Sequence, residues 1–502
     1  AVTSLLRNER CGILFWNKKK APELSAPSGI GAADFAGAGT PLKFNSVDFR
    51  DGQQSLFATR LTTADMIPLL EQMDAVGYDS MEMWGGATFD VAVRFLKDDP
   101  WERVRTFKKY VKKTPLKMVL RGQNLVGYKA YPDDVVEAFI AQAAEAGIDV
   151  FLTFDALQDL RNCETAFKAI KKAGKKIEGS VQYNVSPFHT TEVFVQNALE
   201  QEQMGASLMH VEDMAGLMTP EAAYELITAL KKALKIPVHL HCHCTGGMAE
   251  MAYWEAIRAG VDGLDVCVSS MSMGPSLPPI ESYLAALKGT SRDPKIDLGQ
   301  FADINKKFAE LRRKYADFGT KLVGVDVGCL QHQIPGGMLS NLTSQLKEQH
   351  AEDKFYDVLE EVPRVRKDLG EPPLVTPSSQ IVGTQAVFNV LMGERYKMVT
   401  KETKDVLSGK YGATAKPFNP EVQKKCIGDT QPITCRPADL LENELGKLEG
   451  EMAQYKEQDE DVLSYALFPQ VAEKFFAVRD KKTPSNIDEN GVRQLVVEDL
   501  SV

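Results

Sequence analysis

Short apolar runs alternate with longer amphipathic stretches through the first half of the chain. A run rich in β-branched and aromatic residues predicts a buried strand, and an amphipathic stretch predicts a helix packed against it. Eight such strand–helix units in succession predict a (β/α)8 barrel over residues 43–290. The eight runs are Phe44–Phe49, Ser80–Met83, Leu116–Leu120, Val150–Phe154, Gly179–Tyr183, Leu208–Val211, Val238–His243 and Gly263–Val268.

The intervening stretches have the spacing and the endings of helices. Several of them stop directly before Gly77, Gly147, Gly174 or Gly260, and glycine adopts the left-handed backbone that ends a helix at little cost. A doubly wound sheet is the alternative fold. It is disfavoured because no glycine-rich phosphate-binding motif follows the first run. The expected helices are Asp65–Val76, Pro132–Ala146, Cys163–Ala173, Thr191–Met204, Pro220–Ala233 and Met248–Ala259.

After about residue 290 the alternation stops and charged helical patterns follow. We therefore expect a mainly helical C-terminal domain over residues 291–477 and a polar tail over 478–502. Residues 1–42 have no regular period and are expected to form an N-terminal arm. The acidic stretch Glu442–Asp461 has helical periodicity and is interpreted as a solvated helix face.

Composition narrows the class of protein. The 502 residues are 44% hydrophobic, and the formal net charge of −10 is spread along the chain, which disfavours nucleic-acid binding. No apolar run approaches the roughly 20 residues that a membrane-spanning helix needs. Eight cysteines, several in apolar surroundings, favour a reduced intracellular protein over a disulfide framework. We therefore expect a cytoplasmic protein.

Candidate metal ligands stand where two predicted strands end. Alternate residues of a strand point to the same side, so His241 and His243 can converge on one point. Asp51 follows the first run, and the carboxyl ends of all barrel strands meet at one face. One carboxylate and two imidazoles suit Zn, Co or Mn. His239 shares their spacing but lies deeper, so we interpret it as a core residue or a support for the ligands.

Two arginines also stand at strand ends. Arg50 and Arg121 each close an apolar run, where a guanidinium requires an anionic partner. That partner is either an internal carboxylate or the carboxylate of a substrate, and the sequence leaves both open for each arginine. Gln54 and Tyr128 supply hydrogen-bonding groups near the same mouth.

These strand ends lie within motifs that recur in order along the chain. They resemble the biotin-dependent carboxyltransferases, the family of the carboxyltransferase domain of pyruvate carboxylase, oxaloacetate decarboxylase alpha and the transcarboxylase 5S subunit. The barrel motifs are Arg50-Asp51-Gly-Gln-Gln-Ser-Leu-Phe-Ala-Thr-Arg60, Trp84-Gly-Gly-Ala-Thr88, Asp99-Pro-Trp-Glu-Arg103, Leu120-Arg-Gly-Gln-Asn124, Asp213-Met-Ala-Gly-Leu217 and His241-Cys-His243. Those of the second domain are Pro335–Asn341, Val375–Gln380 and Gly383–Val387, and Ser269–Ser272 and Val362–Arg366 resemble the 5S subunit in particular.

The resemblance covers about Phe44 to Phe476 and implies a reaction. It implies a barrel that uses a divalent metal and moves carboxylate between carboxybiotin and a 2-oxo acid, with pyruvate and oxaloacetate as the default pair. The implied roles are metal ligation by Asp51, His241 and His243, binding of the substrate carboxylate by Arg121, and lining of the pocket by Arg50, Gln54 and Tyr128.

Three positions depart from the family pattern. Glu212 stands where the family has a lysine that is carbamylated by CO2 and ligates the metal. A glutamate carries the same charge on a shorter side chain, so Glu212 is a possible fourth ligand and a candidate catalytic residue. Gln53 replaces a histidine and Leu152 replaces an arginine. Three polar changes in one pocket suggest a retuned or silenced site.

The chain has no candidate for biotin attachment. Lys117-Met118 lies inside a predicted strand and lacks the Ala-Met-Lys-Met context of a biotinyl lysine. We therefore expect biotin on a separate carboxyl carrier subunit, further carboxylase or transcarboxylase subunits as partners, and a homodimer as in the family. The alternatives are a catalytically silent paralogue that scaffolds a carboxylase complex and a metal-dependent aldolase or acyl-CoA condensing enzyme on the same barrel.

Overall fold

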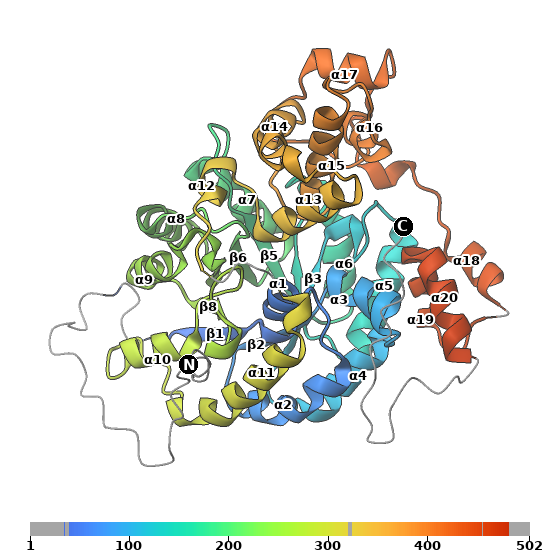
Figure 1. Cartoon of the computed structure of the whole chain (residues 1–502). Helices are drawn as coiled ribbons and strands as arrows, with labels where there is room; N and C mark the ends of the chain where they lie inside the picture. Colours follow the sequence, from blue (N-terminus) through green and yellow to red (C-terminus); the bar gives the residue numbers. More distant parts are fainter. Residues whose placement is uncertain (1–34, 36–39, 320–323, 454, 481–502) are drawn as a thin grey trace, which may run out of the picture.

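The computed structural model describes residues 35, 40–319, 324–453 and 455–480. Eight parallel strands pair in the order β1 to β8, and β1 pairs with β8 to close a barrel, so the predicted (β/α)8 fold is confirmed and the doubly wound alternative is wrong. All eight predicted strands are present (Figure 1). The strands are β1 Lys43–Ser46, β2 Ser80–Trp84, β3 Leu116–Leu120, β4 Val150–Thr153, β5 Lys176–Gln182, β6 Leu208–Asp213, β7 Val238–Cys242 and β8 Gly263–Val266.

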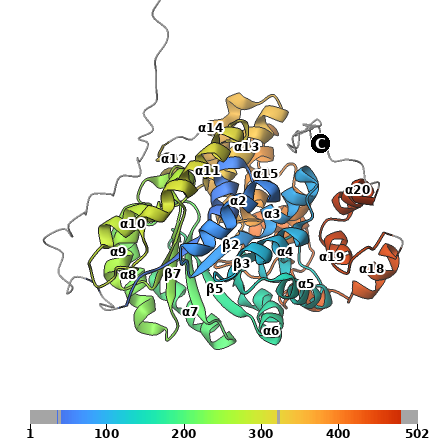
Figure 2. The same cartoon turned by 90° about the horizontal axis from the view of Figure 1, so that it is seen from below.

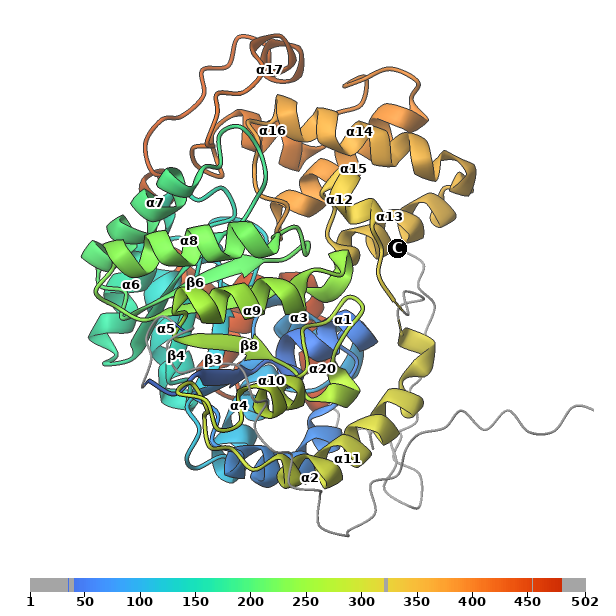
Figure 3. The ribbon, with the colours of Figure 1, turned by 90° about the vertical axis from the view of Figure 1, so that its left-hand side faces the viewer.

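Helices cover the outside of the barrel (Figures 1 and 3). Their ends follow local chemistry: the Thr62 and Thr219 side chains accept hydrogen bonds from the first turns of α2 and α8, and Gly147 and Gly260 have positive φ where α5 and α9 end. The helices are α1 Gln53–Phe57, α2 Thr63–Ala75, α3 Gly86–Val91, α4 Pro100–Tyr110, α5 Asp133–Ala146, α6 Glu164–Lys172, α7 Thr191–Met204, α8 Pro220–Ala233, α9 Ala249–Ala259 and α10 Ile280–Leu287.

The first strand is shorter than its apolar run. It ends at Ser46, and the chain turns into a single π-helical turn, η2 Asp48–Gly52, that leads directly into α1. Asp48 holds this turn because its carboxylate accepts hydrogen bonds from Ser46 Oγ and from the amide of Val268. Asp51 therefore projects from a buried turn after β1, rather than from the strand itself.

The C-terminal half is helical, and its helices pack into two different hydrophobic cores. Helices α13–α17 have a core of their own and lie on the side of the barrel where the strands end (Figure 1). In contrast, α11, α19 and α20 share the core of the barrel. The helices are α11 Phe301–Lys314, α12 Gly328–His332, α13 Gly336–Glu348, α14 Phe355–Asp368, α15 Ser378–Leu391, α16 Lys401–Leu407, α17 Pro420–Ile427, α18 Leu445–Met452, α19 Glu460–Leu467 and α20 Pro469–Asp480.

The last helices lie against the flank of the barrel (Figure 2). Trp101 Nε1 on α4 donates to Ser464 Oγ on α19 over 3.0 Å, and Tyr131 donates to the carbonyl of Leu467. The acidic stretch Glu442–Asp461 is not one helix, because the chain leaves α18 after Met452 and begins α19 at Glu460. Most of the predicted arm, 1–42, and tail, 478–502, lies outside the described residues.

Two observations on the described part of the chain concern membrane-spanning helices and cysteines. No helix there is both long and apolar enough to span a bilayer. Its seven cysteines are all free thiols, and five of them are buried.

Candidate active site

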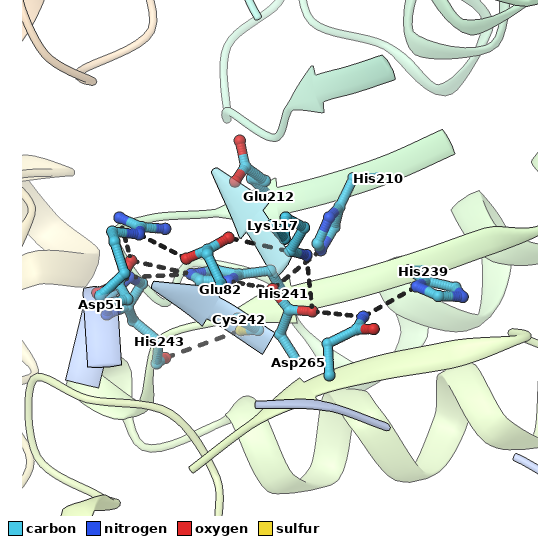
Figure 4. Close-up of polar contacts among 12 residues, drawn as sticks. Asp51, Glu82, Lys117, His210, Glu212, His239, His241, Cys242, His243 and Asp265 are labelled. Carbon is cyan, nitrogen blue, oxygen red and sulfur yellow. Dashed lines mark hydrogen bonds and ion pairs between the residues drawn. The ribbon is translucent and has the colours of Figure 1, made fainter. Parts of the chain in front are cut away.

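Asp51, His241 and His243 converge at the mouth of the barrel, as the sequence predicts. Asp51 comes from η2, His241 from β7 and His243 from the residue just after β7 (Figure 4). One ligand atom of each residue lies within 4.8 Å of the others, and all three side chains are buried. The Nε2 atoms of His241 and His243 lie 3.7 and 3.6 Å from the two Asp51 carboxylate oxygens.

The hydrogen bonds of the two histidines fix which ring nitrogen carries the proton. His241 Nδ1 lies 2.9 Å from the carboxylate of Asp265, and His243 Nδ1 lies 2.7 Å from the carbonyl of Pro275. Both partners are acceptors, so each Nδ1 is the donor. The Nε2 lone pairs then face each other across 3.2 Å. Two acceptors placed so close, beside a carboxylate, fit a bound cation.

The Asp51 carboxylate lies between the two imidazoles of this cluster. Burial alone would raise the pKa of Asp51, but Arg50 and the two histidines outweigh it and hold that pKa far below its usual range. Burial alone would lower the pKa of His243, but the negative charge of Asp51 raises it. Asp51 Oδ2 is in ion-pair contact with Arg50 and receives no hydrogen bond from the described residues. An ionised carboxylate between two imidazoles therefore attracts positive charge.

Arg50 forms ion pairs with carboxylates of the protein itself. Its Nη1 lies 2.9 Å from Asp51 Oδ2, and its Nε lies 2.5 Å from Glu82 Oε1 on β2. Burial would lower the pKa of Arg50, but the two carboxylates raise it. The structure places this arginine as the clamp that orients Asp51.

Arg121 has a different environment. It is buried, and its Nη1 donates to the carbonyls of Val126 and Gly127, yet no described Asp or Glu forms an ion pair with it. A Cβ at Gly86 would lie 2.3 to 2.5 Å from the guanidinium, so the glycine leaves the space that Arg121 occupies. A buried guanidinium without an internal counter-ion is suited to an anionic ligand.

Tyr128 lies beside Arg121. The guanidinium carbon is 5.5 Å from the centre of the Tyr128 ring, and the Tyr128 hydroxyl donates to Asp90 over 3.3 Å. Burial raises the pKa of Tyr128. Gln54, on α1, is half-buried and makes no side-chain hydrogen bond within the described residues. Its amide is therefore open to another partner.

Glu212 lies next to His241 in the register of β6 and β7 but turns toward β5. Its Oε2 accepts hydrogen bonds from Ser180 Oγ, over 2.8 Å, and from Gln182 Nε2. It is not a member of the ligand cluster, whose atoms lie within 4.8 Å of one another. The side chains of β5 thus hold the carboxylate that occupies the position of the family's lysine.

The other two departures have structural roles. Gln53 is fully buried; its amide donates to the carbonyl of Phe49 and accepts from the amide of Leu61, which fixes η2 and α1. Leu152 is also fully buried and belongs to a small apolar cluster with Phe154 of the barrel and Val375 of the helical half. Neither side chain offers a charge to the pocket.

A layer of charged groups beneath the cluster is not predicted from the sequence. Single polar residues in the middle of apolar strands meet inside the barrel: Glu82, Lys117, Glu178, His210 and Asp265 are all 0 to 2% exposed. The signal is present in the chain, because a charged residue between two apolar neighbours on a buried strand must find an opposite charge.

A cavity of about 640 Å³ lies where the barrel meets the helical half. Tyr128 and the helices α13, α15 and α16 border it; its lining includes Gln345, Gln380 and Thr384, and Tyr411 also faces it. Asp51 and the two histidines are not among its lining residues. The cavity therefore reaches the Tyr128 side of the mouth.

A closed (β/α)8 barrel with an Asp–His–His cluster at its carboxyl face defines a barrel enzyme. A family model described as HMGL-like matches residues 41–307, and one described as Conserved carboxylase domain matches residues 329–497. The chain belongs to the carboxyltransferases of biotin-dependent carboxylases, as the motifs predict, and the expectation of an enzyme of this family is confirmed.

Relatives of known identity and structure match along most of their length. The chain is 52% identical over 447 residues to a subunit of the pyruvate carboxylase of Methanocaldococcus jannaschii, covering 88% of this chain and 79% of that one. It is 50% identical over 437 residues to the methylmalonyl-CoA carboxyltransferase 5S subunit of Propionibacterium freudenreichii subsp. shermanii, covering 86% of each. The carboxyl transferase domain of Rhizobium etli pyruvate carboxylase, solved with pyruvate and biocytin, matches with a TM-score of 0.85 and 32% identity over 91% of this chain and 80% of that one.

Proposed function

We propose that this chain transfers carboxylate between carboxybiotin, carried by a separate subunit, and a 2-oxo acid, with pyruvate and oxaloacetate as the substrate pair. The observation that carries this proposal is Arg121, a buried guanidinium at the mouth with no ion-pair partner among the described side chains. The carboxylate of a 2-oxo acid supplies the missing charge and accepts two parallel hydrogen bonds from such a group.

A divalent cation, Zn, Co or Mn, is held by Asp51, His241 and His243. The facing Nε2 lone pairs and the ionised carboxylate support this assignment. When bound, the cation would supply a Lewis acid at the keto oxygen of the substrate. Glu212 acts from outside this ligand set, because its carboxylate is hydrogen-bonded to Ser180 and Gln182.

The other side chains at the mouth bind the substrate or orient the metal ligands. Arg121 holds the substrate carboxylate, and the Tyr128 ring covers the guanidinium on one side. Arg50 keeps Asp51 in place. The methyl group of pyruvate loses a proton as biotin gains one at the ring nitrogen that released CO2, and the enolate carbon bonds to that CO2 to give oxaloacetate. The reverse sequence decarboxylates oxaloacetate.

The carrier reaches the mouth from the side of the helical half. The cavity of about 640 Å³ beside Tyr128 has room for the bicyclic ring of biotin and is bordered by polar groups such as Gln380 and Thr384. A biotin carboxyl carrier subunit and further carboxylase subunits are accordingly the expected partners. A homodimer and a cytoplasmic location remain predictions from the sequence.

Biotin-dependent decarboxylation of oxaloacetate tests the proposal. Metal-loaded protein is mixed with oxaloacetate and either free biotin or a biotinylated carrier domain, and pyruvate is measured with lactate dehydrogenase. We expect pyruvate formation that requires both the protein and biotin. Turnover no faster than that of a metal-free sample would contradict the proposed substrate pair. A parallel assay with the carboxylated form of 2-oxoglutarate would reveal whether the enzyme uses a longer 2-oxo acid.

A further inference from the structure

Lys117 is a fully buried lysine on β3 whose ammonium has three carboxylates around it. Nζ lies 3.3 Å from Glu178 Oε1, 3.6 Å from Asp265 Oδ1 and 3.7 Å from Glu82 Oε2. Lys117, Glu82 and Asp265 are each 0% exposed, so this charge has no access to water. A charge buried this deeply is tolerated because opposite charges surround it, and removing the ammonium alone would leave those carboxylates uncompensated.

Two of the three carboxylates extend to the candidate metal ligands. Asp265 Oδ2 accepts the hydrogen of His241 Nδ1, while its Oδ1 faces Lys117 and Asn45. On the other side, Glu82 Oε2 faces the ammonium and receives no hydrogen bond within the described part of the chain, while its Oε1 is bound by Arg50. Figure 4 shows Lys117 between Glu82 and Asp265, in a chain of contacts that leads from Asp51 to His241.

The third carboxylate binds His210 of β6. Glu178 Oε1 lies 2.5 Å from His210 Nδ1, and Asp265 Oδ2 lies 3.3 Å from His210 Nε2. His210, His241 and Asp265 have the spacing of a second metal-ligand cluster. The ammonium of Lys117 contacts both carboxylates and the His210 ring bridges them, so we interpret this second cluster as a support for His241 and not as a second metal site.

We propose that Lys117 is a positioning residue for the metal centre, which holds Asp265 against His241 Nδ1 and Glu82 against Arg50 so that His241 and Asp51 present their ligand atoms to one cation. This inference rests on the metal site proposed above. Groups that orient metal-ligating histidines typically change metal affinity by roughly 10- to 100-fold when they are removed. Without the ammonium, Asp265 and Glu82 lose a shared partner, and the side chains of His241 and Asp51 are no longer held in one orientation.

Titration of the full chain with Co²⁺ tests the proposal, since the visible absorption band of Co²⁺ reports ligand geometry as well as affinity. The variants are Lys117→Met, which keeps the length of the side chain without its charge, and Lys176→Met, which changes an exposed lysine on strand β5. Thermal unfolding of each variant is recorded beside the titration. We expect wild type and Lys176→Met to bind one Co²⁺ alike, and Lys117→Met to bind it roughly 10- to 100-fold more weakly with a shifted band.

A wild-type affinity and spectrum in folded Lys117→Met would overturn the role of Lys117, and so would tighter binding, because a lysine that only repels the cation gives that result. If Lys117→Met does not fold, Lys117→Met with Glu178→Gln removes one charge of each sign. The pair is still expected to bind Co²⁺ weakly, because Asp265 and Glu82 remain without the ammonium, and wild-type binding by the pair would overturn the proposal. A wild-type chain that binds no Co²⁺ would instead contradict the metal site itself.

Discussion

His241 and His243 face each other through their Nε2 atoms, 3.2 Å apart, while an oxygen acceptor holds each Nδ1. The two rings come from one strand end, yet their orientation is set by Asp265 on β8 and by the carbonyl of Pro275 beyond it. The cluster is therefore arranged before any ligand arrives. Preorganised ligands lower the cost of binding a cation.

The first prediction concerns the three ligands. We expect His243→Ala and Asp51→Ala to lose the metal that wild type retains after dialysis, because each removes one of three convergent donor atoms. Metal content is measured by elemental analysis of purified protein. His350→Ala, an exposed histidine of the helical half, is the control and should keep the full content. Stoichiometric metal in both ligand variants would place the ion elsewhere.

Glu212→Gln separates ligation from other roles of this carboxylate. Glu212 is bound by Ser180 and Gln182 and lies outside the ligand cluster, so we expect the variant to keep its metal with less than about a tenfold change in affinity. The affinity is measured by competition with a chelator. Metal loss as complete as in His243→Ala would make Glu212 a ligand.

Arg121→Gln tests the substrate clamp. The guanidinium has no internal ion pair among the described residues, so we expect its loss to raise the KM for oxaloacetate by roughly 10- to 100-fold, the equivalent of about 1.5–3 kcal/mol for a charged hydrogen bond. Arg258→Gln, on the outer helix α9, should leave KM unchanged. An unchanged KM in Arg121→Gln would assign the substrate carboxylate to another group.

Gly86→Ala tests the space reserved for that clamp. The new Cβ would meet the Arg121 guanidinium at 2.3 to 2.5 Å, so the side chain must move and KM should rise as in Arg121→Gln. Gly450→Ala on α18 is the matched control, since no atom among the described residues lies within 4 Å of its Cβ, and we expect it to be neutral or stabilising by up to about 1 kcal/mol. Steady-state kinetics and thermal unfolding measure the two effects; wild-type KM in Gly86→Ala would contradict this packing of Arg121 against Gly86.

Ser464→Ala tests how the C-terminal helices are held to the barrel. Its hydroxyl accepts the hydrogen bond of Trp101 Nε1, and its loss leaves a buried indole donor unsatisfied. We expect destabilisation by about 1–3 kcal/mol, measured by urea unfolding. Ser408→Ala, whose hydroxyl donates to the carbonyl of Lys404 at the end of its own helix, should cost less; equal losses would indicate that α19 contributes little to the barrel.

The sequence predicts the barrel well because its strands are short, mainly apolar runs and several of its helices end at a glycine. It also predicts the positions of Asp51 and His241, since strand ends of a barrel share one face. It does not distinguish Arg50 from Arg121, because both close apolar runs and only the fold shows that Glu82 and Asp51 reach the first and that none of the described carboxylates reaches the second.

The layer of buried charged residues beneath the candidate metal ligands could not be predicted from the sequence for a related reason. Lys117 and Asp265 are each a single polar residue in an apolar strand, and nothing local indicates that strands β3 and β8 bring them within 3.6 Å. The same holds for Glu212, whose side chain is directed by Ser180 and Gln182 on the neighbouring strand. Charge pairing across a barrel depends on register and side-chain direction, and the periodicity of one strand contains neither.

Anomalous diffraction from crystals grown with Co²⁺ or Zn²⁺ would locate the metal in the barrel. The structure predicts one strong peak at the mouth, about 2.0–2.2 Å from His241 Nε2, His243 Nε2 and one oxygen of Asp51, with Glu212 still bonded to Ser180. No peak at this position, or a peak held by His210 and Asp265 beneath it, would rule out a metal site at Asp51, His241 and His243.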